Sequence, residues 1–427
     1  MSQTQKSDRA LMKQSNQSLV LQLIQRRGPI SRKAIATVSG LSPASVTGIT
    51  GELITRGLVH EVGEADGDGR AGRRAVLLRL NPHAGFVVGV KLTTQSVDCV
   101  LTDLDANILQ AASTPLRFDD NTAPSQVSYA PHAMIEATIQ AVEHLLSMTE
   151  IDRKRLLGMG VGVNGIVDAN TGVSHFAPHY GWRNVPLADP LAAHFGIPVY
   201  LENDARTLTI AEQWFGAARG VDHFAAVAVG HGIGAGVVTN GRIYRGALGG
   251  AGEFGHTVLQ PDGPPCSCGR RGCVEALAAA PAIMRQIEEA LARGEPSLLG
   301  ATEQRTMQHV ADAADRGDEL ARRVLAAAGH WLGVGVSSLV NILNPQLLII
   351  TGEAVQCGRW YFEPMEATLR ALAFDGLAET LRIHIEPADN NMWARGAACV
   401  VLNALFTSPM HQPHPAFHPD TRALALP

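Results

Sequence analysis

The sequence predicts an α/β protein in two parts, an N-terminal winged helix-turn-helix and a larger two-lobed body. Residues 1–80 contain 12 Lys or Arg against 6 Asp or Glu, a net charge of +6, so the remainder carries −11 of the total of −5. Helical periodicity dominates the first 60 residues, and from Asn81 onward strand and helix patterns alternate. A basic front on an acidic body indicates a nucleic-acid-binding module joined to another kind of domain, with a merely solvated basic face as the alternative.

Length and composition narrow the class of protein. A chain of 427 residues, of which 46% are hydrophobic, is long enough for two or three domains with substantial cores. Uninterrupted apolar runs stay below the length of a membrane span, and the N-terminus is polar, which argues against a span or a secretory signal. We therefore expect a cytoplasmic protein, in which structural disulfides are rare.

The N-terminal module is expected to contain three helices. Apolar residues at 19–24 follow helical spacing, and "RRGP" ends that first helix. Ser31 can cap a second helix that buries Ile35 and Val38, and Ser42 followed by proline begins a third. The inner face of the third helix carries Val46, Ile49 and Leu53. Two helices joined by a short turn form a helix-turn-helix, whose second helix enters the major groove of DNA.

The expected DNA contacts lie on the third helix and on a wing. "GLVHEVGE" and "RAVLLRLNP" form two strands around the loop "ADGDGRAGRR", whose arginines can reach phosphates or the minor groove. The third helix contains Gly48 and Gly51, each costing about 1 kcal/mol relative to Ala, and its exposed start has no Lys or Arg. The candidate DNA-binding residues are Ser42, Ala44, Ser45, Thr47, Arg70, Arg73 and Arg74.

The body is expected to consist of two similar halves. In the first, strands at 85–94, 96–105 and 108–116 form a meander, followed by a helix at 131–149, a strand at 156–168, a helix at 187–196 and a strand at 198–204. In the second, strands lie within 223–246, helices run from 275 to 341, and a buried strand lies at 345–353. Two such halves face each other across a cleft, where ligands usually bind.

Four stretches of the body are distinctive, namely "GWRNVPLADPLAAHFGIPVYLENDA", "GHGIGAGVVTNGRIYRGALGGAGEFGH", "CSCGRRGCVE" and "LVNILNPQLLIITG". In this order they resemble the ROK family of sugar kinases and sugar-responsive repressors. The resemblance implies an actin-like, ribonuclease-H-like ROK domain of two lobes with an interlobe cleft. The fused N-terminal module resembles the repressor branch, which includes regulators of N-acetylglucosamine, glucose and xylose genes.

The expected domain boundaries follow from this resemblance. Residues 1–80 form the winged helix-turn-helix, and residues 81–204 form the first lobe, completed by a C-terminal helix at 390–406. Residues 205–389 form the second lobe with the cysteine cluster. The Pro- and His-rich residues 407–427 are expected to be a disordered tail.

The motif "LENDA" places Asn203 and Asp204 at the end of a strand that faces the expected cleft. An Asp there can accept a hydrogen bond from a sugar hydroxyl or take its proton, and an Asn adds a donor and an acceptor. For an isolated Asn-Asp pair the alternative is a turn and helix cap. The resemblance assigns five residues to hexose hydroxyls, namely Asn203, Asp204, Glu253, His256 and Glu275, with Asp204 as the base if the protein is a kinase.

The segment "CSCGRRGC" at 266–273 allows three interpretations, a metal site, a redox pair or a disulfide. His256, Cys266, Cys268 and Cys273 supply one nitrogen and three sulfurs, a set that suits tetrahedral Zn²⁺. Four protein ligands leave no position for water, so the expected zinc is structural, and a thiol–disulfide switch is the alternative. Because imidazole has two nitrogens, His256 can bind metal and sugar together.

The ATP side departs from the kinase pattern at three places. The resemblance implies an Asp-X-Gly-Gly-Thr loop that cradles phosphate and helps to hold magnesium, but the aligned stretch "GVKLTTQ" has Lys91 instead of Asp and threonines instead of glycines. The loop "GHGIGAG" has His231 where the family usually has Thr, and "TGE" has Glu353 instead of Gly. We therefore expect no catalytic residue and no requirement for ATP or Mg²⁺.

The sequence thus predicts a transcriptional regulator, most simply a repressor of carbohydrate uptake or catabolism genes, that senses a sugar or sugar derivative without phosphorylating it. The expected partners are operator DNA and the effector, and a homodimer or homotetramer without membrane attachment is expected. The alternative is an ATP-dependent hexose or amino-sugar kinase with an accessory DNA-binding module. Regulation by a docked protein is a third possibility.

Overall fold

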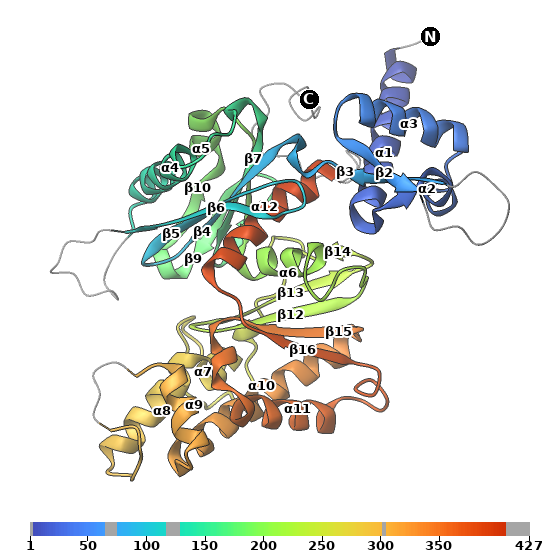
Figure 1. Ribbon diagram of the computed structural model, residues 1–427. Coiled ribbons are helices and arrows are strands. Elements are labelled where there is room, and N and C mark those ends of the chain that lie inside the picture. Colours follow the sequence, from blue (N-terminus) through green and yellow to red (C-terminus); the bar gives the residue numbers. More distant parts are fainter. Residues whose placement is uncertain (1–2, 65–74, 117–128, 301–304, 407–427) are drawn as a thin grey trace. The chain divides into compact units, whose positions relative to one another are not determined.

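The N-terminal module has a winged-helix arrangement. The computed structural model describes residues 3–64, 75–116, 129–300 and 305–406 (Figure 1). The module comprises α1 (Gln3–Arg27), β1 (Ile30–Ser31), α2 (Arg32–Ser39), α3 (Pro43–Thr55), β2 (Val59–Glu64) and β3 (Val76–Leu80), with β3 antiparallel to both other strands. The three expected helices and the hairpin are confirmed. Arg70, Arg73 and Arg74 lie outside the described residues.

Side-chain caps begin the two helices of the helix-turn-helix. Ser31 Oγ accepts a hydrogen bond from the Ala34 N–H (3.2 Å), and Ser42 Oγ accepts one from the Ser45 N–H (3.1 Å). Both caps were expected. The burial of Val38 was wrongly expected, because its side chain is 44% exposed. Val38 lies about 60° around the helix axis from the buried Ile35, in the last turn of α2.

A five-stranded sheet follows, in the order β11-β7-β4-β5-β6. Its strands are β4 (Phe86–Leu92), β5 (Ser96–Thr102), β6 (Ile108–Pro115), β7 (Leu156–Val163) and β11 (Val199–Asn203). β4, β5 and β6 form the expected antiparallel meander, and β7 and β11 extend it in parallel. The helices α4 (Pro131–Ser147) and α5 (Ala188–Phe195) cover one face and complete an apolar core.

The opposite face of this sheet packs closely against α12 (Asn390–Phe406). A Cβ on Gly160 would lie 1.8 Å from the Ala397 carbonyl oxygen, and one on Gly89 would lie 1.9 Å from that of Ala394. Only glycine at these two positions allows the helix backbone to approach the strands so closely.

Between β7 and α5 the chain forms a small antiparallel sheet. Its strands are β8 (Ile166–Asp168), β9 (Val173–Ala177) and β10 (Trp182–Pro186). The expectation of a single strand at 156–168 is therefore wrong in one respect, because two strands, β7 and β8, cover this range. Gly165 causes the division: its φ of +84° lies in the left-handed region, and a Cβ there would meet the Phe176 carbonyl oxygen at 2.1 Å.

The chain forms two compact units, residues 1–207 with 393–427, and residues 208–392. α6 (Asp204–Trp214) begins in the first unit and ends in the second. The second unit contains a sheet in the order β14-β13-β12-β15-β16. Its strands are β12 (Phe224–Val229), β13 (Ile233–Thr239), β14 (Arg242–Ile243), β15 (Leu347–Thr351) and β16 (Arg382–Glu386).

One face of this second sheet is covered by helices. They are α7 (Val274–Ala278), α8 (Ala280–Ala292), α9 (Met307–Asp315), α10 (Glu319–Leu343) and α11 (Arg359–Leu372). Leu348 and Ile350 face this helical core, whereas Leu347 and Ile349 face the other side. α10 is long and apolar enough to cross a membrane, but half of its most apolar window is buried. Packing in the core accounts for its apolar composition.

Candidate functional site

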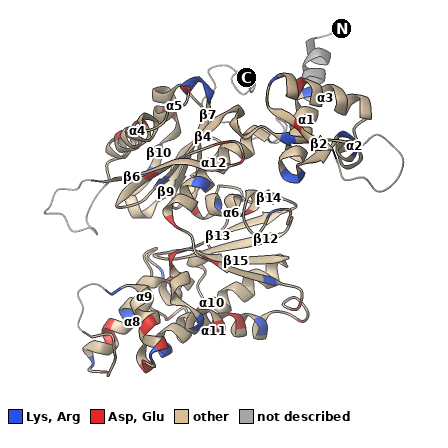
Figure 2. Ribbon diagram, in the orientation of Figure 1, with Lys and Arg blue, Asp and Glu red and all other residues tan. Residues whose placement is uncertain are grey.

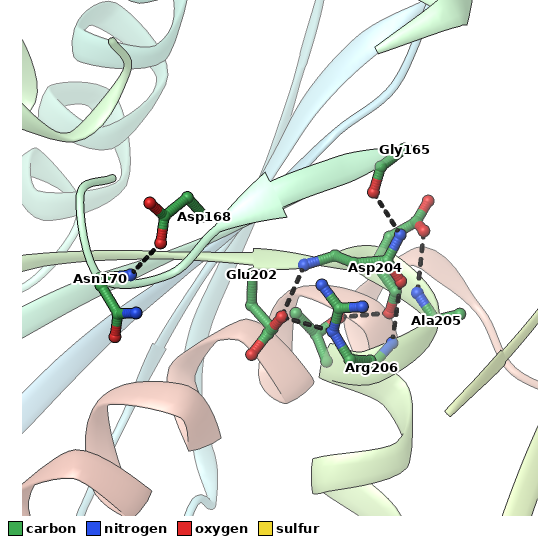
Figure 3. Close-up of polar contacts among 9 residues, drawn as sticks. Gly165, Asp168, Asn170, Glu202, Asp204, Ala205 and Arg206 are labelled. Atoms are coloured by element: carbon green, nitrogen blue, oxygen red, sulfur yellow. Dashed lines mark hydrogen bonds and ion pairs between the residues drawn. The ribbon is translucent and has the colours of Figure 1, made fainter. Parts of the chain in front are cut away.

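Asn203 ends β11 and Asp204 begins α6. Figure 3 shows Asp204 at this turn, beside Gly165 and Ala205. Asn203 Nδ2 donates to the Gly165 carbonyl oxygen (2.9 Å), and Asn203 Oδ1 accepts from the Arg206 N–H (3.2 Å). The fully buried Glu202 accepts hydrogen bonds through Oε1 from the Asn203 N–H (3.0 Å) and from Arg206 Nε (2.6 Å). The amide of Asn203 therefore caps α6, as expected of the turn-and-cap alternative, while Asp204 contributes the carboxylate.

The carboxylate of Asp204 forms an ion pair with Lys91. Lys91 Nζ lies 2.8 Å from Asp204 Oδ2, and the two side chains are 12% and 23% exposed. The ammonium also lies 4.2 Å from the ring centre of Trp393. Because little water screens these charges, they attract each other more strongly than a surface pair. Burial alone would raise the pKa of Asp204, but the charge and hydrogen bond of Lys91, together with the Ala205 N–H, hold that pKa below its usual value.

The strand register explains how residues 113 positions apart meet. Lys91 on β4 is the register partner of Gly162 on β7, which is in turn the partner of Glu202 on β11. Register partners point to the same face of a sheet, and Gly162 has no side chain between Lys91 and Glu202. Asp204 follows Glu202 by two residues, where β11 passes into α6, and its carboxylate lies 2.8 Å from Lys91 Nζ. Sequence reasoning identified Lys91 only as a lost magnesium partner. Its pairing with Asp204 depends on strand order, which no local pattern reveals.

The second unit carries a cluster of one imidazole and three thiols. The ligand atoms of His256, Cys266, Cys268 and Cys273 all lie within 4.8 Å of one another. Cys266 Sγ lies 3.6 Å from His256 Nδ1, and Cys268 Sγ lies 3.7 Å from Cys273 Sγ. Sulfurs bound to one zinc ion at about 2.3 Å would be about 3.7 Å apart. The spacing therefore fits a tetrahedral metal site and exceeds a disulfide bond.

Tight turns bring these four ligands together. Gly269 and Gly272 have φ values of +86° and +62°, in the region that favours glycine. A Cβ on Gly272 would lie 1.5 Å from the Gln260 carbonyl oxygen. Cys99, Cys357 and Cys399 are buried, as expected for packed thiols.

Glu275 connects the cluster to the glycine-rich loop that begins at Gly230. It lies on the first turn of α7, as expected. Its Oε1 accepts a hydrogen bond from Ser267 Oγ (2.9 Å), and its Oε2 accepts one from the Ile233 N–H (3.1 Å). Glu275 is thus held by the cluster segment and engages one of the backbone donors of the glycine-rich loop.

A second carboxylate, that of Glu353, packs against the same loop. A Cβ on Gly230 would lie 1.7 Å from Glu353 Oε2, and one on Gly232 would lie 3.0 Å from Glu275 Oε2. A phosphate-binding loop directs backbone N–H groups at an anion. Carboxylates at two points of this loop repel a phosphate group, because like charges at such distances are unfavourable.

The expected sugar-binding residues are divided between the two units. Asn203 and Asp204 belong to the first unit, and Glu253, His256 and Glu275 belong to the second. Glu253 precedes the 3₁₀ turn η5 (Phe254–His256), and the His256 N–H donates to the Glu253 carbonyl oxygen (3.1 Å). The tight turn between Glu253 and His256 is therefore present. Each unit assembles its own part of the set.

The start of α3 presents small side chains to solvent. Ser42, Ala44, Ser45 and Thr47 are exposed. Ser42 Oγ lies 2.8 Å from Ser45 Oγ, and Thr47 Oγ1 donates to the Pro43 carbonyl oxygen (2.8 Å). A Cβ on Gly48 or Gly51 would have no atom within 4 Å. This helix face is therefore low in relief.

Basic residues lie on and near the helix-turn-helix. Figure 2 shows Lys and Arg on α2 and at the end of α1, where Arg26 and Arg27 occupy the last turn. Arg32, which sequence reasoning did not single out, donates through Nε to Thr50 Oγ1 (3.0 Å) and pairs with Glu61 (2.9 Å). Arg32 thus ties α2 to α3 and β2 and fixes the geometry of the module.

Comparison with known proteins identifies both parts of the chain. A family model described as "ROK family" matches residues 87–404, and one described as "MarR family" matches residues 14–71. The N-acetylglucosamine repressor of Escherichia coli O6:H1 is 32% identical over 396 residues, covering 92% of this chain and 94% of that protein.

Two solved structures are similar. A ROK family transcriptional regulator, a homologue of the E. coli MLC protein, superposes with a TM-score of 0.80 at 28% identity, covering 92% of this chain and 97% of that one. A ROK family glucokinase from Streptomyces griseus, in complex with glucose and AMPPNP, superposes with a TM-score of 0.63 at 27% identity, covering 74% of this chain and 99% of that one. The regulator thus matches the fused module as well as the body.

Proposed function

Because the chain belongs to the ROK family, we propose that it is a sugar-responsive, DNA-binding transcriptional regulator, most simply a repressor of carbohydrate uptake or catabolism genes. The winged-helix module binds operator DNA and the ROK domain binds the sugar. The observation that carries the sensing role is the ion pair between Lys91 and Asp204.

The ion pair favours binding over phosphoryl transfer. A kinase needs a base that removes the proton of the attacking hydroxyl, and such a base works best when its pKa lies near the working pH. Lys91 lowers the pKa of Asp204 and occupies its Oδ2 atom. An ionised carboxylate can still accept a hydrogen bond from a sugar hydroxyl. The carboxylates of Glu275 and Glu353 against the glycine-rich loop further oppose ATP binding.

We infer that His256, Cys266, Cys268 and Cys273 hold a structural Zn²⁺ ion. Four protein ligands close the coordination shell, so the ion supplies rigidity and no bound water for chemistry. With His256 Nδ1 facing Cys266 Sγ, the Nε2 atom stays free for a sugar hydroxyl. The cluster also positions Glu275 through Ser267.

The proposal also assigns the residues that contact DNA and sugar, the oligomeric state and the domain bounds. Ser42, Ala44, Ser45, Thr47, Arg70, Arg73 and Arg74 contact DNA, and Asn203, Asp204, Glu253, His256 and Glu275 contact the sugar. A cytoplasmic homodimer or homotetramer presents two modules to two half-sites. The domain division is 1–80, 81–204 with 390–406, and 205–389, followed by a tail at 407–427.

Two assays on the purified full-length chain test the proposal. A thermal-shift screen against monosaccharides and their phosphates should find a ligand that raises the Tm by mass action. A coupled ADP-release assay with that ligand should find no turnover. ADP release at about 1 s⁻¹ or faster would establish the kinase alternative. A screen in which no sugar raises the Tm would direct the search to a protein effector.

A further inference from the structure

Two carboxyl groups meet inside the second unit. Glu212 on α6 is fully buried, and its side chain lies within hydrogen-bonding distance of Glu386 at the end of β16. Glu212 Oε2 accepts from the Ala217 N–H (3.0 Å), and Glu386 Oε2 lies 3.2 Å from His384 Nε2. The remaining oxygens, Glu212 Oε1 and Glu386 Oε1, are buried and have no hydrogen-bond partner in the described part of the chain.

A buried hydroxyl lies on the face of the sheet that carries Glu386. Thr351, at the end of β15, is fully buried and is the register partner of Glu386, so both side chains lie on one face of the sheet. That face also carries Leu347 and Ile349 and packs against Ala218, just beyond α6. Thr351 Oγ1 has no hydrogen-bond partner among the described residues. With both carboxyl groups ionised, three buried oxygens from α6, β15 and β16 therefore lack a hydrogen-bond donor among the residues that the structure describes.

A shared proton or a bound cation can compensate these buried oxygens. Burial, with the hydrogen bond and charge of Glu386, raises the pKa of Glu212 to about 8, because two adjacent buried carboxylates cannot both ionise cheaply. A shared proton would satisfy the carboxyl groups and leave Thr351 Oγ1 without a partner. A cation can take all three oxygens as ligands. The side chain of Glu386 is 28% exposed, so water can reach the cluster and complete a coordination shell.

We propose that Glu212, Thr351 and Glu386 bind a hard divalent cation, Mg²⁺ or Ca²⁺. All-oxygen ligands with two negative charges suit these ions, whereas zinc prefers the nitrogen and sulfur ligands of the cysteine cluster. The ion would fasten the end of α6 to the edge strand β16. This site is independent of the proposed regulatory function and of the zinc cluster.

The test measures cation binding to the full-length protein. After dialysis against metal-free buffer, MgCl₂ or CaCl₂ is added at about pH 8.5 and at about pH 6, with ionic strength held constant. The Tm should rise by about 3 °C at the higher pH and by less at the lower pH, because protons compete for the ligands. Thr351→Val should abolish the rise, and Thr351→Ser, which keeps the hydroxyl, should preserve it. Cys268→Ser should preserve it too.

Equilibrium dialysis with Ca²⁺ measures binding to the wild-type chain directly, so the test does not depend on whether a variant folds. The wild-type chain should bind one ion per chain, and Glu212→Gln, which resembles the protonated acid, should bind none. No bound ion and no Tm response in the wild-type chain would show that the carboxyl groups share only a proton. A Tm response that survives both Thr351→Val and Glu212→Gln would place the ion elsewhere and overturn the assignment.

Discussion

Asp204 and Lys91 face each other as opposite charges at positions where, by resemblance, the kinases of the family have a base and a magnesium-binding acid. The Lys at 91 does more than remove a metal ligand, because its ammonium lies 2.8 Å from the carboxylate that a kinase would use. Trp393 beneath the ammonium adds a cation–π contact and limits its movement. Lys91 thereby keeps Asp204 ionised, which favours a carboxylate that accepts hydrogen bonds over one that removes a proton.

Replacing Lys91 with Met should destabilise the protein by about 2–4 kcal/mol at neutral pH, because Asp204 would remain as a largely buried charge without a partner. In the wild type the lowered pKa of Asp204 contributes stability above the unfolded pKa, and that contribution is lost as the pH falls through the folded pKa. In the variant, burial without Lys91 raises the pKa of Asp204. The free energy of unfolding should therefore increase, instead of decreasing, as the pH falls and Asp204 is protonated. Urea unfolding at several pH values measures both effects.

The second substitution Asp204→Asn serves as the control. Lys91→Met with Asp204→Asn should recover most of the stability that Lys91→Met loses, because the unpaired charge is gone. Equal stabilities of wild type and Lys91→Met at neutral pH would contradict the account of the ion pair.

At the scale of elements, local chemistry was sufficient wherever a helix or strand is set by its own residues. Ser31 and Ser42 cap α2 and α3 as expected, and the meander of β4, β5 and β6 follows its hydrophobic pattern. Two features could not be predicted from local residues. The exposure of Val38 depends on how α2 packs. The break between β7 and β8 at Gly165 depends on the close approach of the Phe176 carbonyl oxygen.

A substitution at Gly48, on the exposed face of α3, tests whether this face lies close to DNA. Gly48→Ala should raise the free energy of unfolding by up to about 1 kcal/mol, because the added methyl group meets no atom within 4 Å. If the face lies in the major groove, operator affinity should nevertheless fall. Fluorescence anisotropy with labelled operator measures the affinity, and Thr55→Ala, on an exposed position at the end of α3, is the control. Unchanged operator affinity of Gly48→Ala would place this face away from the DNA.

At the scale of the whole molecule, two compact units share the expected sugar-binding residues. The Asp204 carboxylate lies at the strand–helix turn of one unit, and His256 and Glu275 lie at the cysteine cluster of the other. The motifs could predict both sets because the residues of each set are close in sequence. The ion pair of Lys91 and the unsatisfied oxygens of Glu212, Thr351 and Glu386 could not be foreseen, because they unite distant segments through strand order.

Removing the metal should separate the functions of the two parts. Cys268→Ser should lose zinc, measured by elemental analysis, and should lose the response to sugar, because His256 and Glu275 are no longer held. The winged-helix module should stay folded and bind operator, since its core and caps lie within residues 19–80. Normal induction of a zinc-free variant would contradict the proposed structural role of the metal.

The central claim is that a sugar is sensed without being phosphorylated. The most direct test measures operator affinity by fluorescence anisotropy with and without the sugar found by thermal shift, in the complete absence of nucleotide. The account predicts that the unmodified sugar alone changes operator affinity by about fivefold or more, a coupling of at least about 1 kcal/mol. An affinity that changes only when ATP is present, accompanied by ADP release, would contradict it.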